Sequence, residues 1–407
     1  MWRPQCMVAW LVRIDQFDGM TLRPSQAGLA ALARGDTAAA RSLLEQGAAE
    51  GDVSAPVWLA LAQLRGRAGD SAGELAAFDR VLELEPRNLA ALLGKGEALW
   101  RANNRRRAVT FYTAALRLAS ASRNIHPDLS PALRRASAAS EELARELENH
   151  ILGRLNDQGF SRGGSPPRFV HALDLMLGKR RIYPQTPRYF YFPELAPIEF
   201  FDRSDFPWAA EVERSTQAIL DELKSVTQGG APSFVPYVPE DNNRPERRQA
   251  GLAGNKAWSA FFLKKDGVLQ PGAETCPRTW EAVREAPLTE IPGRAPSVLF
   301  SKLSPGARIP PHTGMINVRL ICHLPLIVPE GCALRVGNET RNWGVGELMI
   351  FDDTIEHEAW NSGDRDRYVL LFDVWRPDIS DDERASVIAL CSAIDSFEEG
   401  QSEAWDA

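Results

Sequence analysis

The sequence predicts a protein of two parts, an all-helical repeat domain followed by a β-sandwich or β-barrel domain with flanking helices. From residue 21 to residue 122 the chain is rich in Ala, Leu, Arg and Glu and repeats itself with a period of about 34 residues. Beyond Phe234, short apolar segments alternate with Gly and Pro at intervals of about ten residues, which is typical of an all-β fold. The Gly-, Ser- and Pro-rich residues 161–168 predict a linker between the two parts.

Composition narrows the class of protein. A chain of 407 residues has enough material for two or three domains, and its net charge of -7 argues against a nucleic-acid partner. The five cysteines are scattered without metal-ligand spacing, which indicates free thiols in a reducing compartment. The apolar run within residues 1–20 is too short for a signal peptide or a membrane span. We therefore interpret residues 1–20 as an extension and expect a soluble, cytoplasmic protein.

The helical part contains an internal repeat. An offset of 34 positions aligns Trp58 with Leu92, Ala68 with Ala102, Phe78 with Tyr112 and Leu82 with Leu116, and a fainter earlier copy places Gly35 before Gly69. This pattern resembles the tetratricopeptide repeat, a helix–turn–helix unit of this length. We count three copies and predict a solenoid over residues 21–160, closed by a capping helix near residues 128–156. Such a solenoid either docks a peptide or protein partner on its concave surface or acts as a spacer, and the residues leave both roles open.

The second part is predicted to cover residues 169–380. Helices are expected near residues 169–177 and 207–226. Strands are expected at residues 258–263, 297–303, 318–328, 333–336, 347–351 and 367–375. The acidic residues 381–407 predict a surface helix and a tail.

Two of these strands alternate cleanly between apolar and other side chains. In the strand at 318–328, Arg319, Ile321 and His323 share one face, opposite an entirely apolar face. In the strand at 367–375, Arg367 and Asp373 share a face. Because a charge inside an apolar strand is costly to bury without a partner, this arrangement indicates a bound anion.

His312 and His357 flank the predicted strands and are candidate metal ligands. Imidazole is a common ligand for metals such as Fe(II). The usual non-haem iron site adds a carboxylate two residues after the first histidine, and Gly314 stands at that position. Spacing alone leaves ordinary structural histidines as an alternative. The pair Asp352–Asp353 is interpreted as a turn before His357, with a distant third metal ligand as the alternative.

Residues 297–377 resemble the aspartyl/asparaginyl β-hydroxylase family of iron- and 2-oxoglutarate-dependent dioxygenases. The matching stretches are Phe300-Ser301, His312-Thr313-Gly314, Arg319-Leu320, His323-Leu324, Phe351-Asp352-Asp353, His357-Glu358 and Arg367. The resemblance implies a double-stranded β-helix of the cupin or jelly-roll type. Family members commonly carry tetratricopeptide-like helices before this domain, in agreement with the repeats.

The resemblance also implies the site and the reaction. By family position, His312 and His357 hold Fe(II) without a carboxylate. The positions that contact 2-oxoglutarate are Trp258, Ser301, His323 and Arg367. Among these, Arg367 and Ser301 are expected to bind the distal carboxylate, which suits the bidentate guanidinium fork. The implied reaction uses O2 to decarboxylate 2-oxoglutarate to succinate and hydroxylates a C–H bond, with the iron performing the oxygen chemistry.

The substrate is the open question. The family's aspartyl hydroxylases resemble Arg-Leu-Arg-x-His in one strand, whereas this chain has Arg319 followed by Ile321 in place of the second arginine. Loss of that cation weakens binding of an aspartyl group by about 1–3 kcal/mol. A peptide or protein side chain, docked by the repeats, remains the first interpretation. A small molecule or a lipid acyl chain is the alternative, and a non-catalytic repeat scaffold is the second alternative.

Overall fold

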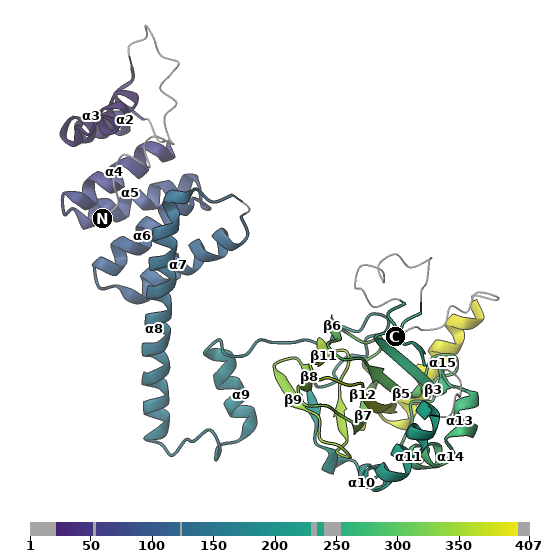
Figure 1. Ribbon diagram of the computed structural model, residues 1–407. Coiled ribbons are helices and arrows are strands. Elements are labelled where there is room, and N and C mark those ends of the chain that lie inside the picture. Colours follow the sequence, from purple (N-terminus) through teal and green to yellow (C-terminus); the bar gives the residue numbers. More distant parts are fainter. Residues whose placement is uncertain (1–21, 52–53, 123, 229–233, 240–253, 398–407) are drawn as a thin grey trace. The chain divides into compact units, whose positions relative to one another are not determined.

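The computed structural model describes residues 22–51, 54–122, 124–228, 234–239 and 254–397 (Figure 1). The chain divides into two compact units between Leu173 and Asp174, a few residues after the predicted linker. The predicted N-terminal extension, residues 1–20, and the end of the predicted tail, residues 398–407, lie outside the described residues. None of the described helices combines the length and the apolarity needed to cross a membrane.

The described residues of the first unit form three helical hairpins followed by a long helix. The hairpins are α2 (Pro24–Ala33) with α3 (Thr37–Ala49), α4 (Ala55–Arg67) with α5 (Ser71–Leu84), and α6 (Leu89–Arg101) with α7 (Arg105–Ser120). The turn inside each hairpin has a residue with positive φ at the same repeat position: Gly35 at 87°, Gly69 at 79° and Asn103 at 57°. Gly and Asn are the residues that adopt this conformation most readily. The predicted three-copy repeat is therefore confirmed.

Stacking of the hairpins depends on close contacts between neighbouring repeats. Phe78 and Tyr112, the aligned aromatic residues, are buried. A Cβ atom at Gly94 would lie 2.4 Å from the ring of Phe78, and one at Gly96 would lie 2.5 Å from the ring of Tyr112. The two glycines thus allow α6 to approach both rings. Helix α8 (Ser130–Asn156), preceded by η1 (Pro127–Leu129), packs against the last hairpin as the predicted capping helix.

The second unit is built around two antiparallel sheets. Its large sheet has the order β1-β10-β7-β12-β5-β3-β2 with β4 beside β3, and its small sheet has the order β6-β11-β8-β9. The strands are β1 (Phe200–Phe201), β2 (Val235–Pro236), β3 (Trp258–Lys265), β4 (Val268–Leu269), β5 (Val298–Leu303), β6 (Arg308–His312), β7 (Arg319–Ile327), β8 (Cys332–Val336), β9 (Glu339–Asn342), β10 (Met349–Phe351), β11 (His357–Asn361) and β12 (Arg367–Trp375). One core cluster joins residues of both sheets, including Leu303 and Leu371 of the large one and Leu334 of the small one. This is the predicted double-stranded β-helix.

Helices cover the outer face of the large sheet (Figure 1). The helices and helical turns of this unit are α9 (Pro167–Met176), which spans the boundary, η2 (Arg203–Asp205), α10 (Ala209–Arg214), α11 (Thr216–Gln228), α13 (Pro271–Thr275), α14 (Pro277–Val283) and α15 (Asp381–Phe397). Side chains of α10, α11 and α14 pack on Leu320, Cys322 and Leu324 of β7. The alternation predicted for this strand is thus confirmed, because Arg319, Ile321 and His323 face the other way, into the space between the sheets.

Some elements differ from the prediction. The single helix expected at residues 207–226 is two helices, α10 and α11, which meet at Ser215. All six expected strands are present, and the described residues contain six more that were not expected: β1, β2, β4, β6, β9 and β11. His312 lies in β6 and His357 in β11. The four cysteines among the described residues are free and buried, in agreement with the expectation of unpaired thiols.

Candidate functional site

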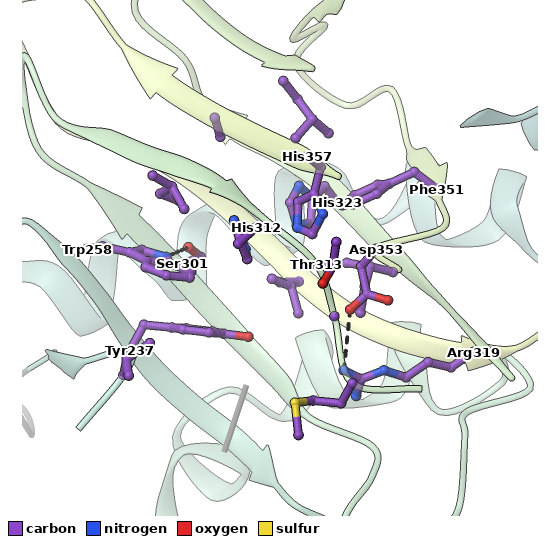
Figure 2. Close-up of a pocket in the computed structure, with 18 of the residues that line it drawn as sticks. Tyr237, Trp258, Ser301, His312, Thr313, Arg319, His323, Phe351, Asp353 and His357 are labelled. Atoms are coloured by element: carbon purple, nitrogen blue, oxygen red, sulfur yellow. Dashed lines mark hydrogen bonds and ion pairs between the residues drawn. The ribbon is translucent and has the colours of Figure 1, made fainter. Parts of the chain in front are cut away.

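The small sheet brings the two histidines together. His312 is the last residue of β6 and His357 is the first residue of β11, and the two are direct partners in the antiparallel ladder. Their ring centroids are 4.1 Å apart. Figure 2 shows both rings pointing into the same cavity between the sheets. The two histidines that were predicted as a pair are therefore neighbours in the structure.

Backbone carbonyls fix the orientation of both rings. Nδ1 of His312 lies 2.8 Å from the carbonyl oxygen of Pro310, and Nδ1 of His357 lies 3.0 Å from that of Ile355. A carbonyl only accepts, so each Nδ1 carries the proton and each Nε2 keeps its lone pair. Burial lowers the pKa of both histidines, and for His357 the charge of His312 adds to this effect. Two neutral imidazoles with a free Nε2 fit a metal ion such as Fe(II).

The space beside Gly314, where the usual carboxylate would stand, is filled by Asp353 from the turn between β10 and β11. A Cβ atom at Gly314 would lie 2.1 Å from Oδ2 of Asp353, so no side chain fits there while Asp353 keeps its place. Asp352 and Asp353 lie in the turn between β10 and β11, as the first interpretation held. The described part of the chain contains no group of three or more His, Cys, Asp or Glu side chains that could hold a metal. A metal held by the two histidines would keep its other positions open for small ligands.

The large sheet supplies the other predicted positions. Trp258 of β3, Ser301 of β5, His323 of β7 and Arg367 of β12 all line this cavity. Trp258 and Arg367 both pair with Leu303 of β5, so the three residues form one row across the strands. Nε1 of Trp258 donates to Oγ of Ser301 at 3.3 Å (Figure 2). The structure thus gathers all of the predicted metal and cosubstrate residues around one cavity.

Arg367 is a buried cation that has no carboxylate partner among the described residues. Its side chain is 1% exposed, and no described residue forms a hydrogen bond with its Nε. No Asp or Glu within the described ranges forms an ion pair with it, and its guanidinium lies over the ring of Trp343, 5.1 Å from the centroid. Burial lowers the pKa of Arg367 to about 10, which leaves it charged at neutral pH. Because an unpaired buried charge is costly, this position favours an anionic ligand.

His323 lies beside Arg367 as a neutral ring. Burial, together with the charge of Arg367, lowers the pKa of His323 to about 3. Its Nδ1 is buried without a hydrogen-bond partner, and its ring stacks on Trp343 with centroids 5.3 Å apart. A buried polar atom of this kind is usually satisfied by a ligand or an ordered water. His323 therefore fits the predicted contact with a cosubstrate.

The two predicted substrate residues differ in whether their side chains can contact a substrate. Ile321 lines the cavity and presents an apolar wall. Arg319 also lines the cavity, but its guanidinium lies 3.5 Å from Asp353 (Figure 2). It also lies 3.4 Å from Asp373. Burial raises the pKa of Asp353 to about 7 against the opposing charge of Arg319. The charge of Arg319 is thus already shared by two buried carboxylates.

Several residues of the site were not predicted. They are Arg188, Tyr237, Trp343, Phe351 and Asp353. Tyr237 stacks on Trp258 with centroids 4.2 Å apart, and Phe351 packs edge-on against both His323 and His357. Phe351 and Asp353 had a signal in the sequence, because both belong to the family-like stretch before His357, and Asp353 was also considered as a distant third metal ligand. Arg188, Tyr237 and Trp343 come from segments whose approach to the cavity depends on the fold.

A double-stranded β-helix with paired histidines in the space between its sheets defines the class of cupin-type proteins. Within this class, residues 213–377 match the family model described as aspartyl/asparaginyl beta-hydroxylase. The resemblance of the β-sheet domain to this family is therefore confirmed.

Three curated relatives illustrate the range of the family. The ornithine lipid ester-linked acyl 2-hydroxylase of Rhizobium tropici is 38% identical over 46% of this chain and 63% of its own length. The human aspartyl/asparaginyl beta-hydroxylase is 35% identical over 44% of this chain and 22% of its own length. The human aspartate beta-hydroxylase domain-containing protein 2 is 32% identical over 50% of this chain and 54% of its own length. The chain thus spans less than two thirds of the length of each relative.

Proposed function

We propose that the β-sheet domain is an Fe(II)- and 2-oxoglutarate-dependent dioxygenase that hydroxylates a C–H bond and converts 2-oxoglutarate to succinate. The observation that carries this proposal is the buried, unpaired guanidinium of Arg367, which shares a cavity with two neutral histidines. A dicarboxylate that also chelates a metal meets both requirements at once. The family match and the hydroxylase names of the relatives support the same reaction class.

The chain's own residues bind and orient the cosubstrate. The fork of Arg367 pairs with the distal carboxylate in two parallel hydrogen bonds, and the hydroxyl of Ser301 donates to the same group. Ile309, Leu334 and Leu371 add apolar surface to the cavity wall. The low local dielectric strengthens the ion pair.

His312 and His357 would hold the metal through their Nε2 atoms. Their Nδ1–H groups are held by backbone carbonyls, so the free Nε2 atoms keep a fixed direction. The bound iron would supply the activation of O2. Phe351, packed against His357 and His323, restricts ring rotation on both sides of the site.

The substrate is proposed to be a peptide or protein side chain, which the repeats would recruit. The alternative is a lipid acyl chain or a small molecule. It is favoured by one specific observation, the apolar Ile321 at the cavity wall. A scaffold without activity is disfavoured because all six predicted metal and cosubstrate residues converge on one cavity.

The metal pair is tested by binding rather than by turnover. The wild-type chain is expected to bind one Mn(II), used as a redox-stable substitute for Fe(II), in an anaerobic calorimetric titration. Either His312→Ala or His357→Ala is expected to weaken binding by more than roughly 100-fold, because even groups that only orient a ligand contribute 10–100-fold. His150→Ala, an exposed residue of α8, is the matched control. Wild-type affinity in His357→Ala would show that the ligand assignment is wrong.

A further inference from the structure

Residues 185–192 connect the two loops that lie next to His312 and His357. The N–H of Thr186 donates to the carbonyl of Thr354 at 2.8 Å, in the turn that precedes His357. The N–H of Arg188 donates to the carbonyl of Gly314 at 3.0 Å, in the loop that follows His312. The segment is therefore tied to both sides of the metal pair. It holds the backbone of Arg188 at the cavity.

Three arginines line the cavity, and two of them already have a role. Arg367 is buried and is assigned to the cosubstrate in the proposed function. Arg319 is buried between Asp353 and Asp373. Arg188 is exposed, and within the described ranges no carboxylate forms an ion pair with it. It is the cavity arginine whose charge stays available to a substrate.

Arg188 lines the same cavity as His312 and His357. An anion bound at Arg188 would therefore lie in the cavity of the metal pair. Ile321 offers an apolar wall in the same cavity. The site thus presents an accessible cation and an aliphatic surface together.

We infer that Arg188 binds an anionic group of the substrate, a carboxylate or a phosphate, while the aliphatic part of the substrate lies against Ile321. This inference rests on the proposed function and names the substrate class of the same site. It moves the anionic anchor from β7, where the sequence placed it at Arg319, to the segment before the sheets. A guanidinium is suited to this task because it pairs with either group in a bidentate geometry.

The test measures binding of small probes to the full chain by calorimetry, with Mn(II) and saturating 2-oxoglutarate present so that Arg367 is occupied. The carboxylate probe is N-acetyl-aspartic acid amide, compared with the neutral N-acetyl-asparagine amide. The phosphate probe is hexyl phosphate, compared with hexanol. At least one anionic probe is expected to bind more tightly than its neutral counterpart, and the pair that does so identifies the source of the charge.

The variant Arg188→Gln is expected to lower the affinity for that anionic probe by roughly tenfold, which is the contribution of one charge-assisted hydrogen bond. Binding of the neutral probes and of 2-oxoglutarate should not change. Arg188→Lys should retain part of the affinity because it keeps the charge. Arg181→Gln removes the same charge from an exposed residue of the preceding segment outside the cavity, and is expected to bind as the wild type does.

The outcomes separate this inference from the proposed function. Equal losses in Arg188→Gln and Arg181→Gln would mean a general surface charge effect and would overturn the inference. The inference would also be overturned if the anionic probes bound no better than the neutral ones while 2-oxoglutarate bound normally. Failure of the wild type to bind 2-oxoglutarate would instead overturn the proposed function, and the inference with it.

Discussion

Arg367→Met is expected to abolish 2-oxoglutarate binding without destabilising the unliganded protein. The bidentate pair with a carboxylate contributes about 3 kcal/mol, so the affinity should fall by roughly 100-fold or more. The unliganded protein, however, loses a buried cation that has no carboxylate partner among the described residues. Replacing such a charge by an apolar side chain of similar volume is neutral or stabilising by about 1–4 kcal/mol. Calorimetric titration and urea unfolding of the same variant measure the two effects.

Arg319→Met is the matched control for this prediction. Its guanidinium contacts Asp353 and Asp373, both buried, so its removal leaves two carboxylates without a counter-charge. We expect a loss of about 3–5 kcal/mol in the free energy of unfolding. If Arg367→Met lost as much stability as Arg319→Met, the guanidinium of Arg367 would have an internal partner, and the argument for a bound anion would fail.

Arg376→Met is expected to produce a large loss of stability in the β-sheet unit. Arg376 is fully buried, and its Nη1 lies 2.9 Å from Oδ2 of Asp352, which is also fully buried. Asp352 in turn accepts from the backbone N–H of Thr354 at 2.9 Å and from Nε2 of Gln185 at 2.5 Å. Removing the cation leaves this carboxylate buried and unpaired, at a cost of about 3–5 kcal/mol. Urea unfolding followed by tryptophan fluorescence gives the value for this unit.

Two further variants show whether the buried pair is responsible. Asp378→Asn removes the other carboxylate that contacts Arg376, and this one is substantially exposed, so we expect a loss below about 1 kcal/mol. The double variant Arg376→Met with Asp352→Leu removes both charges and should recover much of the stability. Equal losses in the single and double variants would contradict the role assigned to the pair.

The parts of the fold that follow from local pattern could be predicted from the sequence. The helical repeat was visible because Gly35, Gly69 and Asn103 recur at the turn that needs a positive φ. Strands β7 and β12 were visible because one face of each is continuously apolar. Both signals are periodic within a short stretch of chain, so no knowledge of the tertiary structure was needed.

The strands that carry the histidines lacked such a pattern. Strand β6 contains Pro310 and Pro311, which argue against a strand in the interior of a sheet. Strand β11 begins with His357 and Glu358 and has little apolar alternation, and β9 is polar and largely exposed. Their pairing is set by the sheets around them. The family resemblance supplied His312 and His357 as candidate ligands, but not the strands that hold them.

Most of the site residues that were not predicted reach the cavity from segments that are distant in the sequence. Arg188 reaches the cavity through backbone hydrogen bonds to the loop at Gly314, and Trp343 reaches Arg367 and His323 from the segment after β9. The partners of Arg319 were also hidden, because Asp353 lies on a different loop from the arginine. The sequence therefore singled out Arg367 as a candidate for anion binding, but it could not show that Arg319 is paired with buried carboxylates, whereas Arg188 forms no ion pair among the described residues.

The central claim is that the cavity consumes 2-oxoglutarate with iron held by His312 and His357. The most direct measurement is succinate formation by the purified full chain supplied with Fe(II), O2 and 2-oxoglutarate, with and without an aspartyl peptide or an acyl lipid. The proposed function predicts succinate that depends on Fe(II), disappears in Arg367→Met and His357→Ala, and persists in His150→Ala. Absence of succinate from the wild type under all of these conditions, or equal amounts from the wild type and His357→Ala, would contradict it.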